Sequence, residues 1–130
     1  MDKVKILVID DEKEILTLVK RRLELEGYEV HTAGNGDEGL KRAKTLKPNL
    51  IICDVMMPEK DGFEVLREIR QDKTQNTIFV MLTAVDDFDK IKKAYDDEAN
   101  FYVTKPVNLA TLSKNVRILL NLAKGRSDCQ

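Results

Sequence analysis

Short apolar runs recur along the chain and predict the strands of a sheet. Three of them are nearly continuous, at Ile6–Ile9, Leu50–Cys53 and Ile78–Leu82, and a weaker one spans Phe101–Val103. Near-continuous apolar runs of this length are typical of strands that are covered on both faces, as in a parallel sheet. The run Val30–Ala33 is short and mixed in polarity, which indicates a strand at the edge of the sheet.

Amphipathic segments lie between these runs and predict five helices. Their apolar residues recur three or four positions apart, so each segment presents one apolar face. The five stripes are Leu16, Val19 and Leu23; Leu40, Ala43 and Leu46; Phe63, Leu66 and Ile69; Phe88, Ile91 and Tyr95; and Leu109, Leu112, Val116, Leu119 and Ala123. The first helix is expected over Glu12–Glu26 with Gly27 as its left-handed stop, and Pro48 closes the second.

Strand and helix therefore alternate five times, and this order predicts the fold. Right-handed crossovers turn the alternation into an open parallel sheet with helices on both faces. We predict an α/β fold, a flavodoxin-like (βα)5 doubly wound architecture with a five-stranded parallel sheet in the order 2-1-3-4-5. The predicted domain spans residues 1–124. Residues 125–130, GRSDCQ, are expected to be a frayed tail, the start of a linker or residues foreign to the natural chain.

Size and composition describe a globular domain and exclude several kinds of partner. The chain has 130 residues with 42% apolar and 35% charged content, and its net charge of −1 gives no footprint for nucleic acid or a membrane surface. No window approaches the roughly 20 apolar residues of a membrane span, and no signal peptide is evident. Cys53 and Cys129 lie in a predicted core strand and in the tail, so we expect free thiols and a cytoplasmic protein.

Polar side chains gather at the carboxyl ends of the predicted strands, where open α/β sheets bind ligands. Asp10 and Asp11 follow the first strand, Asp54 ends the third, Thr83 ends the fourth, and the fifth runs into Lys105. Because the first and third strands are neighbours, three carboxylates converge there and repel one another unless a cation intervenes. Lys105 is one candidate cation. Mg²⁺ is the other, because the site has few carboxylates and room for waters.

A metal, a nucleophilic carboxylate, a hydroxyl and a lysine are the parts needed for phosphoryl transfer to aspartate. In this interpretation Asp54 attacks, the metal and Lys105 neutralise the transferring oxygens, and Thr83 donates a hydrogen bond to another. Each residue also has an ordinary structural explanation. Asp11 could cap the first helix, Thr83 could be a turn residue, and Lys105 could be a solvated turn charge. Their convergence at one edge of one sheet favours the functional interpretation.

Four motifs in this order resemble the receiver domain of two-component response regulators, the CheY-like family. They are IDDE at 9–12, DVMMPEKDG at 54–62, LTA at 82–84 and YVTKP at 102–106, and the resemblance covers residues 3 to about 123. It implies a phosphorelay signal-transduction protein in which Asp54 accepts a phosphoryl group. The donor would be a sensor histidine kinase, a phosphotransfer protein or a small molecule such as acetyl phosphate. Such a protein is not an enzyme, although it assists its own phosphorylation and dephosphorylation.

The resemblance also implies a role for each residue of the site. The implied Mg²⁺ ligands are Asp11, Asp54 and the backbone carbonyl of Met56, with Asp10 contributing through a water. The implied phosphoryl-binding groups are Thr83, Lys105 and the backbone amide of Ala84. The Lys105–Pro106 peptide is expected to be cis. Pro58 and Gly62 are expected to shape the turn into the third helix.

The same resemblance implies a switch between two states. Phosphorylation would draw Thr83 toward the added negative charge, and Tyr102 would turn inward into the vacated space. The face formed by the fourth helix, the fifth strand and the fifth helix would then change its preference for a downstream protein partner. Half-buried packing in a strand is the alternative explanation for Tyr102. A homodimer that depends on phosphorylation is a further option.

Three positions depart from the usual pattern or modify it. Glu98 stands where many receivers have glycine, so we expect either a differently shaped loop or strain there. Ile78 stands where a proline commonly opens the fourth strand. Met56 follows Asp54 by two residues, and its thioether cannot orient an attacking water as an amide can. We therefore expect slow self-dephosphorylation.

Two other functions compete with this interpretation. A phosphatase of the haloacid dehalogenase type would use Asp10 as its nucleophile, but its Asp-x-Asp pattern is not met because Glu12 stands at the second position. A receiver-like interaction module that is never phosphorylated is disfavoured because all five site residues are present.

Overall fold

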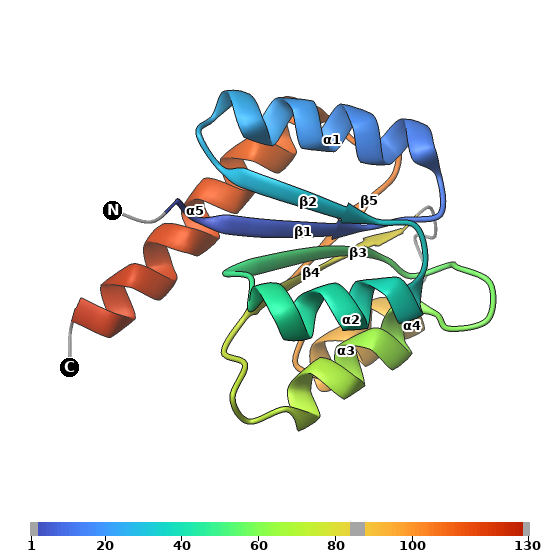
Figure 1. The fold of residues 1–130 in the computed structure, drawn as a ribbon. Helices are drawn as coiled ribbons and strands as arrows, with labels where there is room; N and C mark the ends of the chain where they lie inside the picture. Colours follow the sequence, from blue (N-terminus) through green and yellow to red (C-terminus); the bar gives the residue numbers. More distant parts are fainter. Residues whose placement is uncertain (1–2, 84–87, 129–130) are drawn as a thin grey trace.

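The computed structural model describes residues 3–83 and 88–128, and its strands form one sheet (Figure 1). They are β1 (Lys5–Ile9), β2 (Glu29–Ala33), β3 (Leu50–Asp54), β4 (Ile78–Thr83) and β5 (Phe101–Thr104). The order is β2-β1-β3-β4-β5, and every neighbouring pair is parallel. The predicted fold is therefore confirmed. The order reverses between β1 and β3, which is the switch point at which sheets of this kind place a ligand.

Helices cover both faces of the sheet, as Figure 1 shows. They are α1 (Lys13–Leu25), α2 (Gly36–Leu46), α3 (Gly62–Gln71), α4 (Phe88–Asp96) and α5 (Leu109–Asp128). Because side chains alternate along a strand, Ile6 and Val8 of β1 pack in the core under α1 and α5, whereas Leu7 and Ile9 pack in the core under α2 and α3. Burial on both faces explains why the strand sequences are nearly continuously apolar.

The helix ends follow local capping chemistry. Asp61 caps α3 through a capping box with Glu64, and Gly27 after α1 has a φ of 97°. The capping residue of α1 is Glu12, whose side chain makes no capping hydrogen bond. The structural explanation of Asp11 as the helix cap is therefore wrong, because Asp11 lies one residue too early.

The last helix is longer than its apolar stripe predicts. The stripe ends at Ala123, whereas α5 continues to Asp128, so residues 125–128 are helical and are not a frayed tail. A helix that is already formed needs only one hydrogen bond for each added residue, so its last turn does not require an apolar face. The domain boundary at residue 124 stays a prediction, and Cys129 and Ala84 lie outside the described residues.

The turn before β5 is strained at Glu98. Strain is one of the two outcomes that the sequence predicts for this residue. Glu98 has a φ of 72°, a left-handed conformation in which a side chain is unfavourable. Arg70 of α3 holds this turn, because its Nε donates to the Glu98 carbonyl at 2.9 Å and its Nη2 to the Asn100 side chain at 2.8 Å. Ile78 at the start of β4 donates its amide to the Asn49 carbonyl at 3.0 Å, a bond that a proline could not make.

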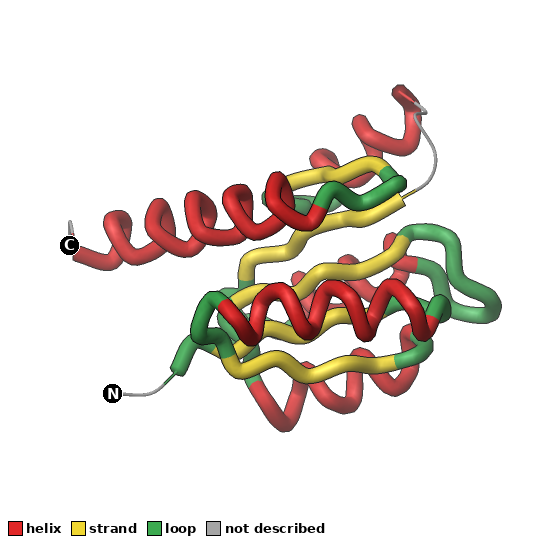
Figure 2. The backbone as a smooth tube through the Cα atoms, turned by 90° about the horizontal axis from the view of Figure 1, so that it is seen from above, coloured by secondary structure: helices red, strands yellow, loops and turns green. Residues whose placement is uncertain are grey.

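Both described ends of the chain lie near the same edge of the sheet, opposite the carboxyl ends of the strands (Figure 2). Among residues 3–83 and 88–128, no helix combines the length and apolarity that crossing a membrane requires.

Candidate functional site

The side chains predicted to form a site converge where the strands end. Asp10 directly follows β1, Asp54 and Thr83 end β3 and β4, and Lys105 directly follows β5. The backbone ties these strand ends together, because the Lys105 amide donates to the Thr83 carbonyl at 2.6 Å. All four residues therefore lie at one edge of the sheet, as the parallel order predicts.

Four carboxylates form an acidic cluster at this edge. Asp10, Asp11, Glu12 and Asp54 each offer one oxygen, and these oxygens all lie within 4.8 Å of one another. Asp10 and Asp54 are 0% and 3% exposed, whereas Asp11 and Glu12 are exposed. The sequence predicts the three aspartates of this cluster and misses Glu12. Its position beside Asp10 and Asp11 was the available signal.

Lys105 provides the positive charge of the cluster. Its Nζ lies 2.9 Å from a Glu12 oxygen, 3.2 Å from Asp10 Oδ2 and 3.4 Å from Asp54 Oδ2. Only 11% of the lysine side chain is exposed, so its ammonium is largely withdrawn from water. Lys105 is therefore not the solvated turn charge that was considered as an alternative.

Burial and neighbouring charges shift the pKa values of the ionisable side chains in the site. Burial raises the pKa of Asp54 to about 6, and the neighbouring Asp10 contributes to that rise. Burial also raises the pKa of Asp10 above its usual value. For Lys105, burial alone would lower the pKa, but the carboxylates of Glu12, Asp54 and Asp10 outweigh it and raise the pKa. A raised carboxyl pKa beside a specific charge partner is typical of functional sites.

Backbone amides satisfy one oxygen of each buried aspartate. The Met56 amide donates to Asp54 Oδ1 at 3.3 Å, and the Glu12 amide donates to Asp10 Oδ1 at 2.9 Å. Asp10 Oδ2 is buried without a hydrogen-bond partner among the described residues, although the Lys105 ammonium lies within ion-pair distance. A buried carboxylate oxygen without a hydrogen bond costs free energy unless a further cation or a water molecule interacts with it.

This set of donors fits a divalent cation such as Mg²⁺. The oxygens are hard carboxylate ligands, they crowd together, and Asp10 Oδ2 has no hydrogen bond from any residue that the structure describes. Asp11 is exposed at the mouth of the cluster, where a bound ion could keep several of its waters. The cluster thus contains all three aspartates that the sequence assigned to a metal. How each aspartate contributes to binding a metal ion, and whether the Met56 carbonyl is a ligand, stay predictions.

The two residues assigned to a switch differ in their burial. Thr83 is fully buried at the end of β4. Tyr102 is half-buried on β5, where it packs against the core under α2 and α3. This is the packing that the structural alternative describes, so its part in a switch stays a prediction. The amide of Ala84, assigned to the phosphoryl group, lies outside the described residues.

The loop between β3 and α3 is fixed by a close backbone approach. The Gly62 amide donates to the Val55 carbonyl at 2.9 Å, and a Cβ at Gly62 would lie 2.4 Å from the Asp54 carbonyl oxygen. Only glycine fits there. In the same loop the Pro58 carbonyl accepts from the Lys60 amide at 2.9 Å, and the Met56 side chain is 54% exposed. Across the site, the Lys105–Pro106 peptide is cis, as predicted.

An apolar groove opens beside the acidic cluster. It has a volume of about 490 Å³ and runs between α1 and the segment that joins β5 to α5. Ile15 and Leu18 line one side and Val107 the other, and Glu12 and Lys105 lie at the end that meets the cluster. The groove and the acidic cluster therefore share Glu12, which lines both.

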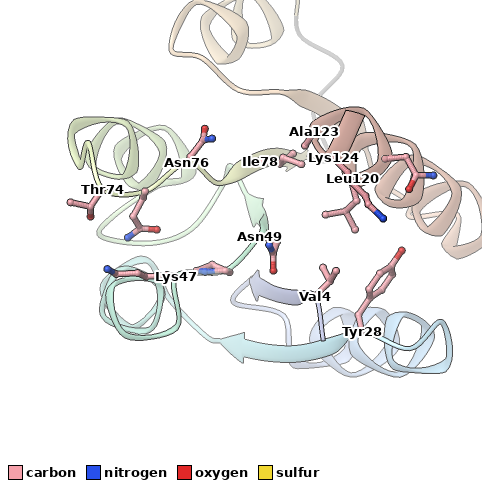
Figure 3. A pocket seen from close by; sticks show the side chains of 13 residues that line it. Val4, Tyr28, Lys47, Asn49, Thr74, Asn76, Ile78, Leu120, Ala123 and Lys124 are labelled. Carbon is pink, nitrogen blue, oxygen red and sulfur yellow. The ribbon is translucent and has the colours of Figure 1, made fainter. Parts of the chain in front are cut away.

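A second cavity lies at the opposite edge of the sheet and is unrelated to the cluster. Its volume is about 600 Å³, and amide and lysine side chains such as Asn49, Asn76, Lys47 and Lys124 line much of it (Figure 3). Among the described residues that line it, none carries a carboxylate, so these residues offer nothing comparable to the site at the other edge.

Comparisons with known proteins agree with this geometry. The model of the response regulator receiver domain matches residues 6–117. The Bacillus subtilis alkaline phosphatase synthesis transcriptional regulatory protein PhoP is 42% identical over 116 residues, 89% of this chain. A receiver domain protein from Clostridium thermocellum has a TM-score of 0.85 at 36% identity, covering 93% of this chain and 97% of its own. One from Methanospirillum hungatei has a TM-score of 0.91 at 28% identity, covering 96% and 99%.

The match to PhoP spans only 48% of that regulator, and the chain spans about half the length of the curated relatives it matches. The solved receiver domains, in contrast, are covered almost completely. The family model, the identity to response regulators and the shared fold agree, and the chain belongs to the family of response regulator receiver domains.

Proposed function

We propose that this domain is a phosphoacceptor that takes a phosphoryl group on Asp54. The observation that carries the proposal is the meeting of Asp54 with Asp10 and the Lys105 ammonium, within an acidic cluster that fits Mg²⁺. The donor would be the phosphohistidine of a sensor histidine kinase or phosphotransfer protein, or a small phosphodonor. The domain would act in the cytoplasm and would not turn over a separate substrate as an enzyme does.

The chemistry follows from the surroundings of Asp54. With a pKa of about 6, its carboxylate is ionised at neutral pH. One carboxylate oxygen forms a bond to phosphorus as the bond between phosphorus and the donor's nitrogen or oxygen breaks, and the electron pair leaves with the donor. Lys105, 3.4 Å from Asp54 Oδ2, would pair with an oxygen of the transferring group. Mg²⁺, when bound, would neutralise charge on the other oxygens.

The site's other residues support the same step. Asp11 and Asp54 would hold Mg²⁺ directly, with Asp10 acting through a water and the Met56 backbone carbonyl as a further ligand. Thr83, which is buried at the end of β4, and the Ala84 amide would bind phosphoryl oxygens. Asp54 ends β3 and Thr83 ends the neighbouring strand β4, so the hydroxyl of Thr83 is on a strand adjacent to the added charge.

A change of output surface would follow from phosphorylation. Added charge at Asp54 would attract Thr83, and Tyr102 on the next strand would leave its half-buried position and pack further inward. The surface formed by α4, β5 and α5 would then favour a different protein partner or a second copy of the domain. PhoP is a transcriptional regulator, and a similar output is open to a longer protein that contains this chain.

One experiment tests the phosphoacceptor function. The protein is incubated with Mg²⁺ and acetyl phosphate, and intact mass is measured for the addition of one phosphoryl group. We expect an adduct that requires Mg²⁺ and that is absent from the Asp54→Ala variant. No adduct in the wild type contradicts the proposal and favours an unphosphorylated interaction module, whereas an equal adduct in the variant contradicts Asp54 as the acceptor.

A second assay on the same protein distinguishes a phosphoacceptor from a phosphatase. Asp10 would be the nucleophile of a phosphatase of the haloacid dehalogenase type, but Glu12 stands where that type has its second aspartate. Continuous hydrolysis of an aryl phosphate that is lost in Asp10→Asn would favour the phosphatase. We expect no such turnover.

A further inference from the structure

Glu12 makes the shortest contact of the Lys105 ammonium. Its Oε1 lies 2.9 Å from Nζ, closer than the oxygens of Asp10 and Asp54 at 3.2 and 3.4 Å. The Glu12 side chain is 58% exposed, whereas the lysine side chain is only 11% exposed, so Glu12 lies over the ammonium on its solvent side. As the capping residue of α1, Glu12 would ordinarily bond a helix amide, but its side chain makes no capping bond.

The backbone fixes this arrangement. The Glu12 amide donates to Asp10 Oδ1 at 2.9 Å, and the Glu12 carbonyl accepts from the Leu16 amide at 3.2 Å. Both hydrogen bonds use main-chain atoms of Glu12. The Glu12 side-chain carboxylate can therefore be changed without removing them. A substitution at Glu12 that keeps the shape of the side chain therefore tests the contact with Lys105 and little else.

An ammonium group has three N–H donors, and three carboxylates already surround Lys105. A transferring phosphoryl group needs one of these donors, and it carries negative charge of its own. The Glu12 carboxylate competes for the donor and repels the incoming group. The Glu12 carboxylate is also the most exposed of the three, so water can solvate it most readily when its contact with Lys105 breaks.

We propose that Glu12 is a positioning residue that holds Lys105 in the unphosphorylated domain and slows the capture of a phosphoryl group by Asp54. This inference rests on the proposed function, and it adds a regulatory feature of the same site. The competing possibility is that Glu12 serves as a metal ligand, because its carboxylate belongs to the acidic cluster. The two roles predict different effects when the charge of Glu12 is removed.

The test uses Glu12→Gln, with Glu14→Gln as the matched control, because Glu14 is exposed in the first turn of the same helix. The rate of phosphorylation by acetyl phosphate is measured at saturating Mg²⁺ and low ionic strength. Removal of one like charge about 5 Å from the reacting group should speed the reaction of Glu12→Gln about three- to fivefold. The gain should shrink at 1 M salt, and Glu14→Gln should match the wild type.

A second measurement does not depend on phosphorylation. Acetic anhydride labels exposed amines, and peptide mass spectrometry gives the extent of labelling at Lys105. We expect Lys105 to be labelled several-fold faster in Glu12→Gln than in the wild type or in Glu14→Gln. If the wild type accepts no phosphoryl group, the proposed function fails, and this labelling still decides whether Glu12 holds Lys105.

Three results would overturn the inference. They are a phosphorylation rate in Glu12→Gln that is equal to or below that of the wild type, unchanged labelling of Lys105, and a rate gain that persists at 1 M salt. A several-fold rise in the Mg²⁺ concentration needed for half-maximal phosphorylation, without a gain in rate at saturating Mg²⁺, would assign Glu12 to the metal instead.

Discussion

Asp54 is held in a position that destabilises its charged form. The pKa of its carboxyl is about 6 in the folded domain, against an ordinary value of 3.8, because it is buried beside Asp10. Between these two values the folded state binds the proton and the unfolded state does not, so stability falls as the pH rises through this window. Above pH 6 the loss is complete.

Asp54→Asn should therefore stabilise the metal-free domain at neutral pH. We expect a free energy of unfolding about 1 to 2 kcal/mol above that of the wild type at pH 7.5 and a smaller difference at pH 4.5. Urea denaturation at both pH values with a chelator present measures this. Added Mg²⁺ should then stabilise the wild type more than the variant, and an equal gain at both pH values would contradict the argument.

Met56 lies two residues beyond Asp54, and the residue is 54% exposed. Its thioether cannot orient an attacking water as an amide can. We expect the phosphorylated Met56→Asn variant to lose its phosphoryl group several-fold faster than the wild type. Loss of the mass adduct over time, after removal of the phosphodonor, measures the half-life. A longer half-life in the variant would exclude this role of Met56.

The residues of the site differ in how well the sequence predicts them. Asp10, Asp54 and Lys105 were predictable because they stand at or next to strand ends, and the parallel order brings those ends together. Glu12 was harder to predict: its place beside Asp10 and Asp11 was a signal, but where a long, exposed side chain lies depends on the charges that it meets in the folded structure. Its sequence position equally favours a helix cap, and only the contact with Lys105 distinguishes the two.

At the scale of the elements, the turn between α4 and β5 stores strain that one substitution can release. Glu98 has a φ of 72°, and the backbone contacts of this turn, to Tyr95 and Arg70, do not involve its side chain. Glu98→Gly should raise the free energy of unfolding by about 0.5 to 1 kcal/mol. Urea denaturation checks this.

Glu98→Ala is the control for that measurement, because alanine removes the side chain beyond Cβ but keeps the Cβ that makes this backbone conformation unfavourable. It should leave stability close to that of the wild type. A gain of equal size in both variants would show that the glutamate side chain, and not its backbone, is the source of the strain.

Element ends were the least predictable part of the fold. The apolar stripe of α5 ends at Ala123, and the helix continues to Asp128 because an existing helix extends without further packing. The cap of α1 is Glu12 and not Asp11, a shift of one residue. Periodicity locates the buried face of a helix well, but it carries little information about exposed final turns.

At the scale of the whole molecule, the alternation of strands and helices was enough to predict the topology. Right-handed crossovers allow few arrangements of five parallel strands, and the one predicted is the one found. The groove between α1 and the start of α5 was not predictable, because it arises where two elements distant in sequence meet with a gap between them.

If a histidine kinase is the phosphodonor, as proposed, this groove is the surface on which we expect it to dock. Leu18 lines it and is 44% exposed, whereas Leu25 near the end of the same helix is 80% exposed and lies outside it. With a histidine kinase that phosphorylates the wild type, Leu18→Lys should reduce the rate of phosphotransfer about tenfold or more, and Leu25→Lys should not. Both variants should react normally with acetyl phosphate, which needs no docking surface. Equal losses with both donors would indicate damage to the site itself.

The tight approach of Gly62 to the carbonyl of Asp54 has a consequence for genetics. Any side chain at residue 62 would push against the backbone that carries Asp54, the proposed phosphoacceptor, although Gly62 has no functional group to offer. A saturation-mutagenesis screen for signalling would therefore rank Gly62 with Asp54 among the least tolerant positions. Intolerance at these two positions would have unrelated origins, steric in one and chemical in the other, and a parallel screen for protein abundance would tell them apart.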